Sequence, residues 1–151
     1  MKATRRTALK TTGAFATLVS LGIITQQQAL AAVNRAGFEA KNLADALKAV
    51  GGEAAANDQV SVVSPDIAEN GAVVPVGATS KIPNTTEIYL LVEKNPSPLA
   101  AKFMIPAGTE ADVQTRLRMG QSTNVVAVVK ADGKLYSATK ETKVTLGGCG
   151  G

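Results

Sequence analysis

Apolar and polar residues alternate along most of the chain after residue 58, and this period of two predicts β-strands. The alternation is clearest over residues 113–119, where Gln and Arg stand between Val, Thr, Leu and Met. Residues 125–129 are instead an uninterrupted apolar run, which is typical of a strand that is covered on both faces. We expect strands over residues 59–64, 72–79, 86–94, 100–105, 113–119, 123–130 and 134–140, and residues 141–146 either continue the last strand or add one.

Turn residues separate these segments. Asp132-Gly133 predicts a two-residue hairpin between the last two strands. Pro65-Asp66 and Asn70-Gly71 mark a turn region. Pro75 has no N–H to donate, so its strand should be an edge strand or contain a bulge. About seven short strands, with a turn roughly every 8–12 residues, predict a mainly β protein with an antiparallel β-sandwich, and a Greek-key barrel is the alternative.

One stretch has the period of a helix. Within residues 34–52, apolar residues recur at i, i+3, i+4 and i+7 between Leu43 and Val50. Asn34 is the expected N-cap, and Gly51-Gly52 is the expected end. We interpret this N-terminal helical segment, residues 32–52, as packing on the flank of the domain rather than as a recognition helix.

Residues 1–31 have the order of an export signal. Basic residues are concentrated in the first ten positions, residues 13–25 are largely apolar, and Ala29-Leu30-Ala31 supplies a small-x-small cleavage pattern. The apolar run is shorter than the roughly 20 residues that cross a bilayer. Arg5-Arg6 resembles the twin-arginine export motif, although Ala8 stands where that motif favours Phe, and an ordinary secretory signal is the alternative. Either signal implies a bacterial periplasm.

The composition excludes several kinds of function. Four of the 16 Lys and Arg residues lie in the first ten positions, so residues 32–151 carry 16 − 4 = 12 basic and 12 acidic side chains. A neutral mature part offers no basic footprint for nucleic acid or for an anionic membrane. The chain has no histidine, which removes the usual general base near neutral pH and the commonest metal ligand. A single cysteine cannot form an internal disulfide, a Cys-x-x-Cys pair or a zinc cluster.

That cysteine is the candidate functional residue. Cys149 stands between Gly147-Gly148 and Gly150-Gly151, so residues 147–151 are predicted to be a flexible arm after a β-sandwich domain over residues 53–146. An ordinary thiol is ionised only to a few per cent at neutral pH, and no other residue of the arm would activate it. We therefore predict a covalent carrier rather than an enzyme.

Two other functions remain open from the residues. Cys149 could only cross-link chains in a structural subunit, or Gly150-Gly151 could act as a C-terminal thiocarboxylate carrier. Arg116 and Arg118 share the polar face of one expected strand. We interpret that face as solvated or partner-facing rather than as an anion site, so neither arginine is a candidate site residue.

The cysteine segment and its surroundings resemble the SoxY family, the sulfur carriers of the bacterial thiosulfate-oxidising Sox system. The resemblance is carried by residues 143–151, by residues 65–76 and 92–100, and by the twin-arginine leader. It implies an immunoglobulin-like sandwich that forms a heterodimer with a second β-sandwich subunit, SoxZ. It also implies that sulfur intermediates of thiosulfate oxidation are attached covalently to Cys149 in the periplasm.

The resemblance implies transient partners as well. SoxAX, a c-type cytochrome, couples thiosulfate oxidatively to the thiol, and SoxB, a dimanganese hydrolase, removes the terminal sulfonate as sulfate. SoxCD, a molybdenum–haem dehydrogenase, oxidises the remaining sulfane sulfur where it is present. The metals in this scheme belong to the partner enzymes, so we expect no metal and no cofactor on this chain.

Overall fold

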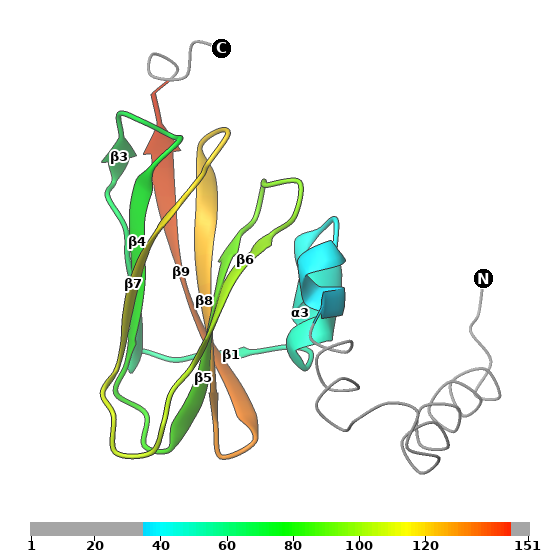
Figure 1. Ribbon diagram of the computed structural model, residues 1–151, viewed down its shortest axis with the longest axis vertical. Coiled ribbons are helices and arrows are strands. Elements are labelled where there is room, and N and C mark those ends of the chain that lie inside the picture. Colours follow the sequence, from blue (N-terminus) through cyan, green and yellow to red (C-terminus); the bar gives the residue numbers. More distant parts are fainter. Residues whose placement is uncertain (1–34, 146–151) are drawn as a thin grey trace, which may run out of the picture. The chain divides into compact units, whose positions relative to one another are not determined.

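Two β-sheets pack face to face in the computed structural model, which describes residues 35–145 (Figure 1). The larger sheet has the strand order β1-β9-β8-β5-β6, with β3 also paired to β9, and the smaller sheet has the order β2-β4-β7. The chain divides into two units, residues 1–36 and 37–151, and the sandwich belongs to the second. The strands are β1 (Ala55–Ala56), β2 (Val60–Val63), β3 (Ile67–Ala68), β4 (Val74–Ser80), β5 (Thr85–Val92), β6 (Leu99–Met104), β7 (Ala111–Leu117), β8 (Thr123–Ala131) and β9 (Lys134–Val144).

The predicted immunoglobulin-like antiparallel β-sandwich is confirmed, with two additions among the described residues. The seven longer strands lie where the alternation predicts them, and residues 141–144 continue β9. The additions are β1 and β3, which have two residues each and run parallel to β9. Two residues are too few to show a period, so the pattern could not predict them, and β3 lies inside the expected turn region.

The hairpin between β8 and β9 forms as predicted. Ala131 and Lys134 are paired across it, and both connecting residues have positive φ, 50° at Asp132 and 73° at Gly133. Positive φ at both positions is the condition of a type I′ turn, whose twist matches that of the two strands. This turn fixes the register of β8 against β9 along nine residue pairs.

The core lies between the two sheets, and a second apolar layer covers the outer face of the larger sheet. In β5, Ile88 and Leu90 point between the sheets, whereas Tyr89 and Leu91 belong to the layer under the helix. In β8, residues 125–129 are buried throughout, which confirms a strand covered on both faces. Full burial of one such Val or Leu side chain stabilises the fold by about 1.5–3 kcal/mol, so β5 and β8 are the main source of stability.

Helix α3 (Leu43–Val50) supplies that second layer. Ala46 and Val50 are its buried residues, and they pack against Tyr89 and Leu91 of β5. The N–H of Gly51 donates to the carbonyl of Leu47, and φ of Gly51 is 137°, so glycine ends the helix as predicted.

The expectation of one continuous helix that begins at Asn34 is wrong. Residues 37–39 are helical, but the helix is broken before α3 begins. The side-chain oxygen of Asn42 accepts a hydrogen bond of 2.8 Å from the N–H of Asp45, and Asn42 has extended backbone angles. Asn42 is therefore an N-cap, which starts a new helix and interrupts the pattern that the apolar residues alone suggested.

Pro75 lies in the middle strand of the smaller sheet rather than in an edge strand. However, β2 pairs only with residues 77–80 of β4, so β4 has no strand neighbour on that side at Pro75. The prediction of an edge is therefore confirmed locally. A missing N–H is tolerated there because no ladder hydrogen bond is required from it.

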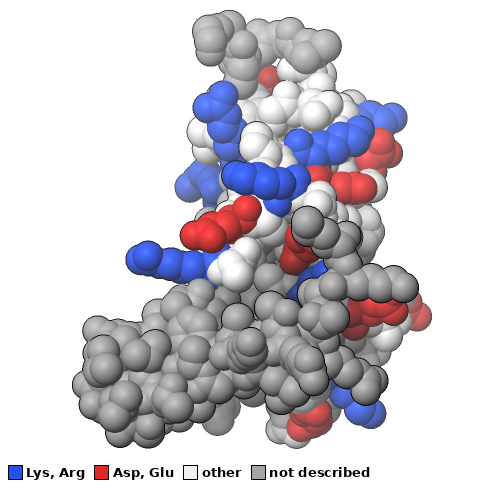
Figure 2. Space-filling model, turned by 90° about the vertical axis from the view of Figure 1, so that its right-hand side faces the viewer, with Lys and Arg blue, Asp and Glu red and all other residues white. Residues whose placement is uncertain are grey.

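Charge on the described part is balanced. Residues 35–145 carry 12 Lys and Arg residues and 12 Asp and Glu residues. Figure 2 shows the two signs interleaved on one face of the molecule rather than separated into a single field.

The cap at Asn42 gives a test of the helix break. Asn42→Ala removes the acceptor for the Asp45 N–H, and we expect it to lower the free energy of unfolding by about 1 kcal/mol. Lys48→Ala, on an exposed position of the same helix, should change it by less than about 0.5 kcal/mol. Urea unfolding followed by circular dichroism measures both, and equal values for the two variants would contradict the assignment.

Candidate functional site

The predicted site residues lie outside the described residues. These are Cys149, Gly147, Gly148, Gly150 and Gly151, and the last described residue is Thr145, directly after β9. The structure therefore describes the place from which the cysteine segment departs. We call this place the arm base, and it comprises Lys143, Val144, Thr145 and the segment 64–69 that pairs with them.

Backbone hydrogen bonds hold the arm base on one side. The N–H of Lys143 donates to the carbonyl of Asp66 at 2.9 Å, and the N–H of Thr145 donates to the carbonyl of Ala68 at 3.1 Å. These bonds belong to the parallel pairing of β3 with the end of β9, in which Ile67 lies opposite Lys143. The chain is therefore fixed in position up to Thr145.

A serine and a glycine hold the other side of the arm base. The N–H of Val144 donates to Oγ of Ser122 at 2.9 Å. Gly71 lies so close that a Cβ on it would be 2.8 Å from Cγ1 of Val144 and would overlap the carbonyl oxygen of Met119. The N–H of Met119 in turn donates to the carbonyl of Gly71 at 2.7 Å. The two loops that carry Gly71 and Ser122, each of which connects the two sheets, thus lie against the end of the last strand.

A polar lock behind the arm base joins segment 64–69 to β9. The hydroxyl of Thr142, which has no exposed surface, donates to Oγ of Ser64 at 2.9 Å. Nζ of Lys140 donates to the carbonyl of Ser64 at 2.6 Å and lies 3.1 Å from a carboxylate oxygen of Asp66. These bonds satisfy the buried polar groups, which would otherwise destabilise the sandwich.

Sequence reasoning missed this lock. Lys140 and Thr142 precede Val144 on the same face of the last strand, and Val144 packs against the core. Polar residues on the core-facing side of a strand need hydrogen-bond partners, and this is the one signal in the sequence that could have pointed to a neighbouring segment. The pattern could not show that Ser64 and Asp66 are those partners, because 76 residues separate Ser64 from Lys140.

Elsewhere in the described chain, a half-buried polar cluster lies on the outer face of the larger sheet. The hydroxyl of Tyr89 donates to Glu87, and Nζ of Lys102 lies 3.5 Å from Glu87 and 5.4 Å from the centre of the Tyr89 ring. Burial, followed by the hydrogen bond and the charge of Glu87, raises the pKa of Tyr89 well above its ordinary value. The raised pKa thus reflects the half-buried position of the hydroxyl and its contact with the Glu87 carboxylate.

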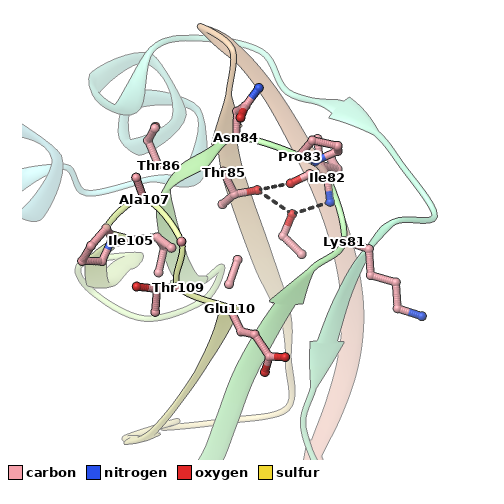
Figure 3. A pocket seen from close by; sticks show the side chains of 14 residues that line it. Lys81, Ile82, Pro83, Asn84, Thr85, Thr86, Ile105, Ala107, Thr109 and Glu110 are labelled. Atoms are coloured by element: carbon pink, nitrogen blue, oxygen red, sulfur yellow. Dashed lines mark hydrogen bonds between the residues drawn. The ribbon is translucent and has the colours of Figure 1, made fainter.

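An open hollow is lined by residues 80–86 and 105–111 (Figure 3), at the end of the strands opposite to the arm base (Figure 1). It is enclosed by the β4–β5 and β6–β7 connections. Its polar groups bond to one another, since Oγ of Ser80 lies 2.9 Å from Oγ1 of Thr85 and accepts from the N–H of Ile82. This hollow is remote from the arm base and adds nothing to it.

Two further findings concern residues 35–145. No three His, Cys, Asp or Glu side chains in this part are grouped so that they could hold a metal ion. None of the helices described there is both long and apolar enough to cross a membrane. Arg116 and Arg118 are both exposed, as predicted for the polar face of β7 and the residues that follow it.

The described architecture is an immunoglobulin-like sandwich whose final strand is held firmly and leads toward a segment with one cysteine. Comparison with known families then identifies the group. The family model "Sulfur oxidation protein SoxY" matches residues 46–149, a range that ends at Cys149. The chain belongs to the SoxY family.

Solved structures agree with this assignment. The sulfur carrier protein SoxY from Chlorobium limicola f. thiosulfatophilum is 39% identical, with a TM-score of 0.63 over 70% of this chain and 97% of that one. A superoxide reductase (neelaredoxin) from Ignicoccus hospitalis is 20% identical, with a TM-score of 0.51 over 58% of this chain and 80% of that one, and it shares the fold alone. No curated protein matches the chain.

Gly71 tests how closely the arm base is enclosed. Gly71→Ala places a Cβ against the Met119 carbonyl and Val144, and we expect it to lower the free energy of unfolding by about 1–3 kcal/mol. Gly120→Ala is the matched control, because a Cβ there meets nothing within 4 Å. Chemical denaturation compares the two, and an unchanged stability of Gly71→Ala would show that the loops are looser than described.

Tyr89 gives a prediction on pH. Because its pKa is raised above the ordinary value of 10.0, the neutral hydroxyl stabilises the fold fully below that pH, and the contribution is lost as the pH rises through the pKa of the folded protein. We expect the free energy of unfolding to fall more steeply above pH 10 in the wild type than in Tyr89→Phe. Denaturant titrations between pH 8 and about 11.5 measure the two slopes, and parallel slopes would rule out this role for Tyr89.

Proposed function

We propose that the chain is a covalent carrier of sulfur intermediates in the periplasm, and that Cys149 is the attachment point. The observation that supports this most directly is the family match, because it extends to Cys149 itself. The fixed arm base supports it further. A carrier has to present its thiol from a defined place, and the described chain is held by hydrogen bonds up to Thr145.

The distance from the arm base to the thiol suits this function. Cys149 follows Thr145 by four residues, which span at most about 13–14 Å at ~3.3–3.6 Å for each residue. Glycine at two of the positions before the cysteine leaves the backbone least restricted. The thiol can thus enter an active site of another protein while the sandwich stays outside.

Loading is an oxidation of the thiol. The thiol of Cys149 loses its proton and forms an S–S bond with the outer sulfur of thiosulfate, and the two electrons released would be taken up, one at a time, by a SoxAX-type cytochrome acting as the oxidant. The product is an S-thiosulfonate, written Cys-S-S-SO₃⁻. Because this chain offers no histidine and only one cysteine, we assign both the redox chemistry and the activation of the thiol to the partner.

Unloading begins with hydrolysis. In a SoxB-type enzyme, water attacks the sulfonate sulfur and the bond to the sulfane sulfur breaks, with its electron pair remaining on the sulfane sulfur. Sulfate and two protons leave, and a persulfide remains on Cys149. A SoxCD-type dehydrogenase, where present, oxidises that persulfide further. A SoxZ-like subunit is the proposed stable partner, and export through the twin-arginine leader places the complex in the periplasm.

Mass spectrometry tests the attachment. The chain with its SoxZ-like partner is incubated with thiosulfate and a SoxAX-type cytochrome, and the intact mass and the C-terminal peptide are measured. We expect a thiosulfate adduct on Cys149 that is absent from Cys149→Ser and from the reaction without cytochrome. A variant that lacks Gly151 should still be loaded, because the chemistry uses the thiol and not the terminal carboxylate.

Two results would contradict the proposal. An adduct that forms equally on Cys149→Ser would exclude the thiol as the attachment point. Full thiosulfate oxidation by a reconstituted system that contains Cys149→Ser would favour a structural subunit in which the cysteine only cross-links chains.

A further inference from the structure

An apolar patch lies on the surface next to the arm base. It consists of five residues on β2, β3, β4 and their connections, namely Val63, Pro65, Ile67, Val73 and Pro75. Val63 is 50% exposed, Ile67 59% and Val73 51%, and these are three of the five large apolar side chains that are exposed in the described chain. Two open hollows of the surface share Pro65 and Pro75, so the patch is continuous.

The fold does not need these side chains. In β2 and β4 the core is filled by the residues that point the other way, such as Val74 and Val76, and Ala68 does the same in β3. Val63 and Pro75 lie on the outer face of the smaller sheet, which no described element covers. Soluble proteins rarely expose a contiguous apolar patch without a binding function.

The patch has the composition of an interface. Polar residues adjoin the apolar centre: Glu69 and Asn70 on the side of the arm base, and Gln114 and Arg116 on the side of β7. Interfaces commonly combine an apolar centre with a polar rim that remains in contact with water. A patch of five residues is small, and this suits a complex that forms and separates repeatedly.

The position of the patch relative to the arm base decides what binds it. Ile67 lies opposite Lys143 in the parallel pairing of β3 with β9, and the carbonyl of Ala68 accepts from the N–H of Thr145. Figure 1 shows β3 beside the end of β9 at one end of the sandwich. The patch thus begins at Ile67, beside the end of β9 and close to the last described residue, Thr145.

From this position we infer that the apolar patch is the surface on which the enzymes that act on Cys149 dock, an inference that rests on the proposed function. The thiol reaches at most about 13–14 Å from Thr145, so an enzyme that takes it into an active site must bring its own surface within that distance. A typical interface covers about 800 Å² of each partner, which is a disc of roughly 16 Å radius. Such a disc, placed over the arm base, includes Ile67 and the neighbouring patch.

The occupant is an exported enzyme with a thiol-binding channel and an apolar surface beside the mouth of that channel. A stable partner subunit is excluded from the apolar patch, because it would permanently cover the surface to which each enzyme must bind. The same patch serves the loading and the hydrolysing enzyme in turn. The SoxZ-like subunit therefore binds elsewhere on the sandwich.

A double variant tests the docking surface. Ile67→Glu with Val73→Glu places two charges at exposed positions of the patch, and Met104→Glu is the matched control, since Met104 is 64% exposed and lies near the opposite end of the sandwich. We expect kcat/KM to fall about tenfold or more for loading by a SoxAX-type cytochrome and for sulfate release by a SoxB-type hydrolase. The control should stay within about twofold of wild type.

Further measurements separate docking from other effects. The rate at which Cys149 reacts with the neutral reagent 4,4′-dithiodipyridine should not change in the variants, because the thiol itself is not altered. The circular dichroism spectrum should also not change, because the fold is retained. Ile67→Ala with Val73→Ala, which introduces no charge, should lower kcat/KM in the same direction by a smaller factor. This second pair keeps the test decisive where two glutamates disturb folding.

Three outcomes would overturn the inference. Unchanged kcat/KM in both patch variants, with a wild type that is loaded normally, contradicts the docking surface alone. Loss of the SoxZ-like subunit from the double variant in size-exclusion chromatography assigns the patch to the stable interface instead. A wild type that forms no adduct removes the proposed function and the docking surface together.

Discussion

The pairing of β9 with its neighbours is the interaction on which the rest of this structure depends. On one side β9 pairs with β8 along nine residues, and on the other it pairs with β1 near its start and with β3 at its end. The single strand thereby ties the core of the larger sheet to the point where the cysteine segment begins. The Thr142–Ser64 hydrogen bond and the contacts of Lys140 with Ser64 and Asp66 add polar bonds to the same strand. A strand that is paired on one edge along nine residues and on the other near both of its ends is fixed up to the point where the described chain ends.

The sequence predicts the strands of the sandwich well where the order of apolar and polar residues reflects which side chains are buried. The apolar run in β8 and the alternation in β7 follow directly from which faces are covered, and Asp132-Gly133 encodes its own turn. The pattern fails at the break before α3, since the local hydrogen bond of Asn42 overrides apolar periodicity. It fails again at β1 and β3, whose existence depends on backbone groups of β9 rather than on their own side chains.

The candidate site, too, has one part that the sequence predicts and another that only the fold reveals. Cys149 can be recognised as a candidate from the sequence alone, because it is the single cysteine and has two glycines on each side. The arm base is not, since its contacts join residues such as Asp66 and Lys143 that are far apart in the chain. The apolar patch could not be recognised either, because Val63 and Ile67 look like core residues until the fold shows that they point outward. The chemistry is thus encoded locally, whereas its presentation is a property of the folded chain.

The parallel pairing of β3 with β9 has a consequence for the order of folding. Ile67 and Lys143 are 76 residues apart, and contacts of such separation form slowly because a long loop must be closed first. The β8–β9 hairpin, by contrast, closes over two residues. We therefore expect the arm base to be among the last parts to form, after the hairpin and the contacts of β8. The pairing of β3 with the end of β9 is then the mark of a chain that has completed folding.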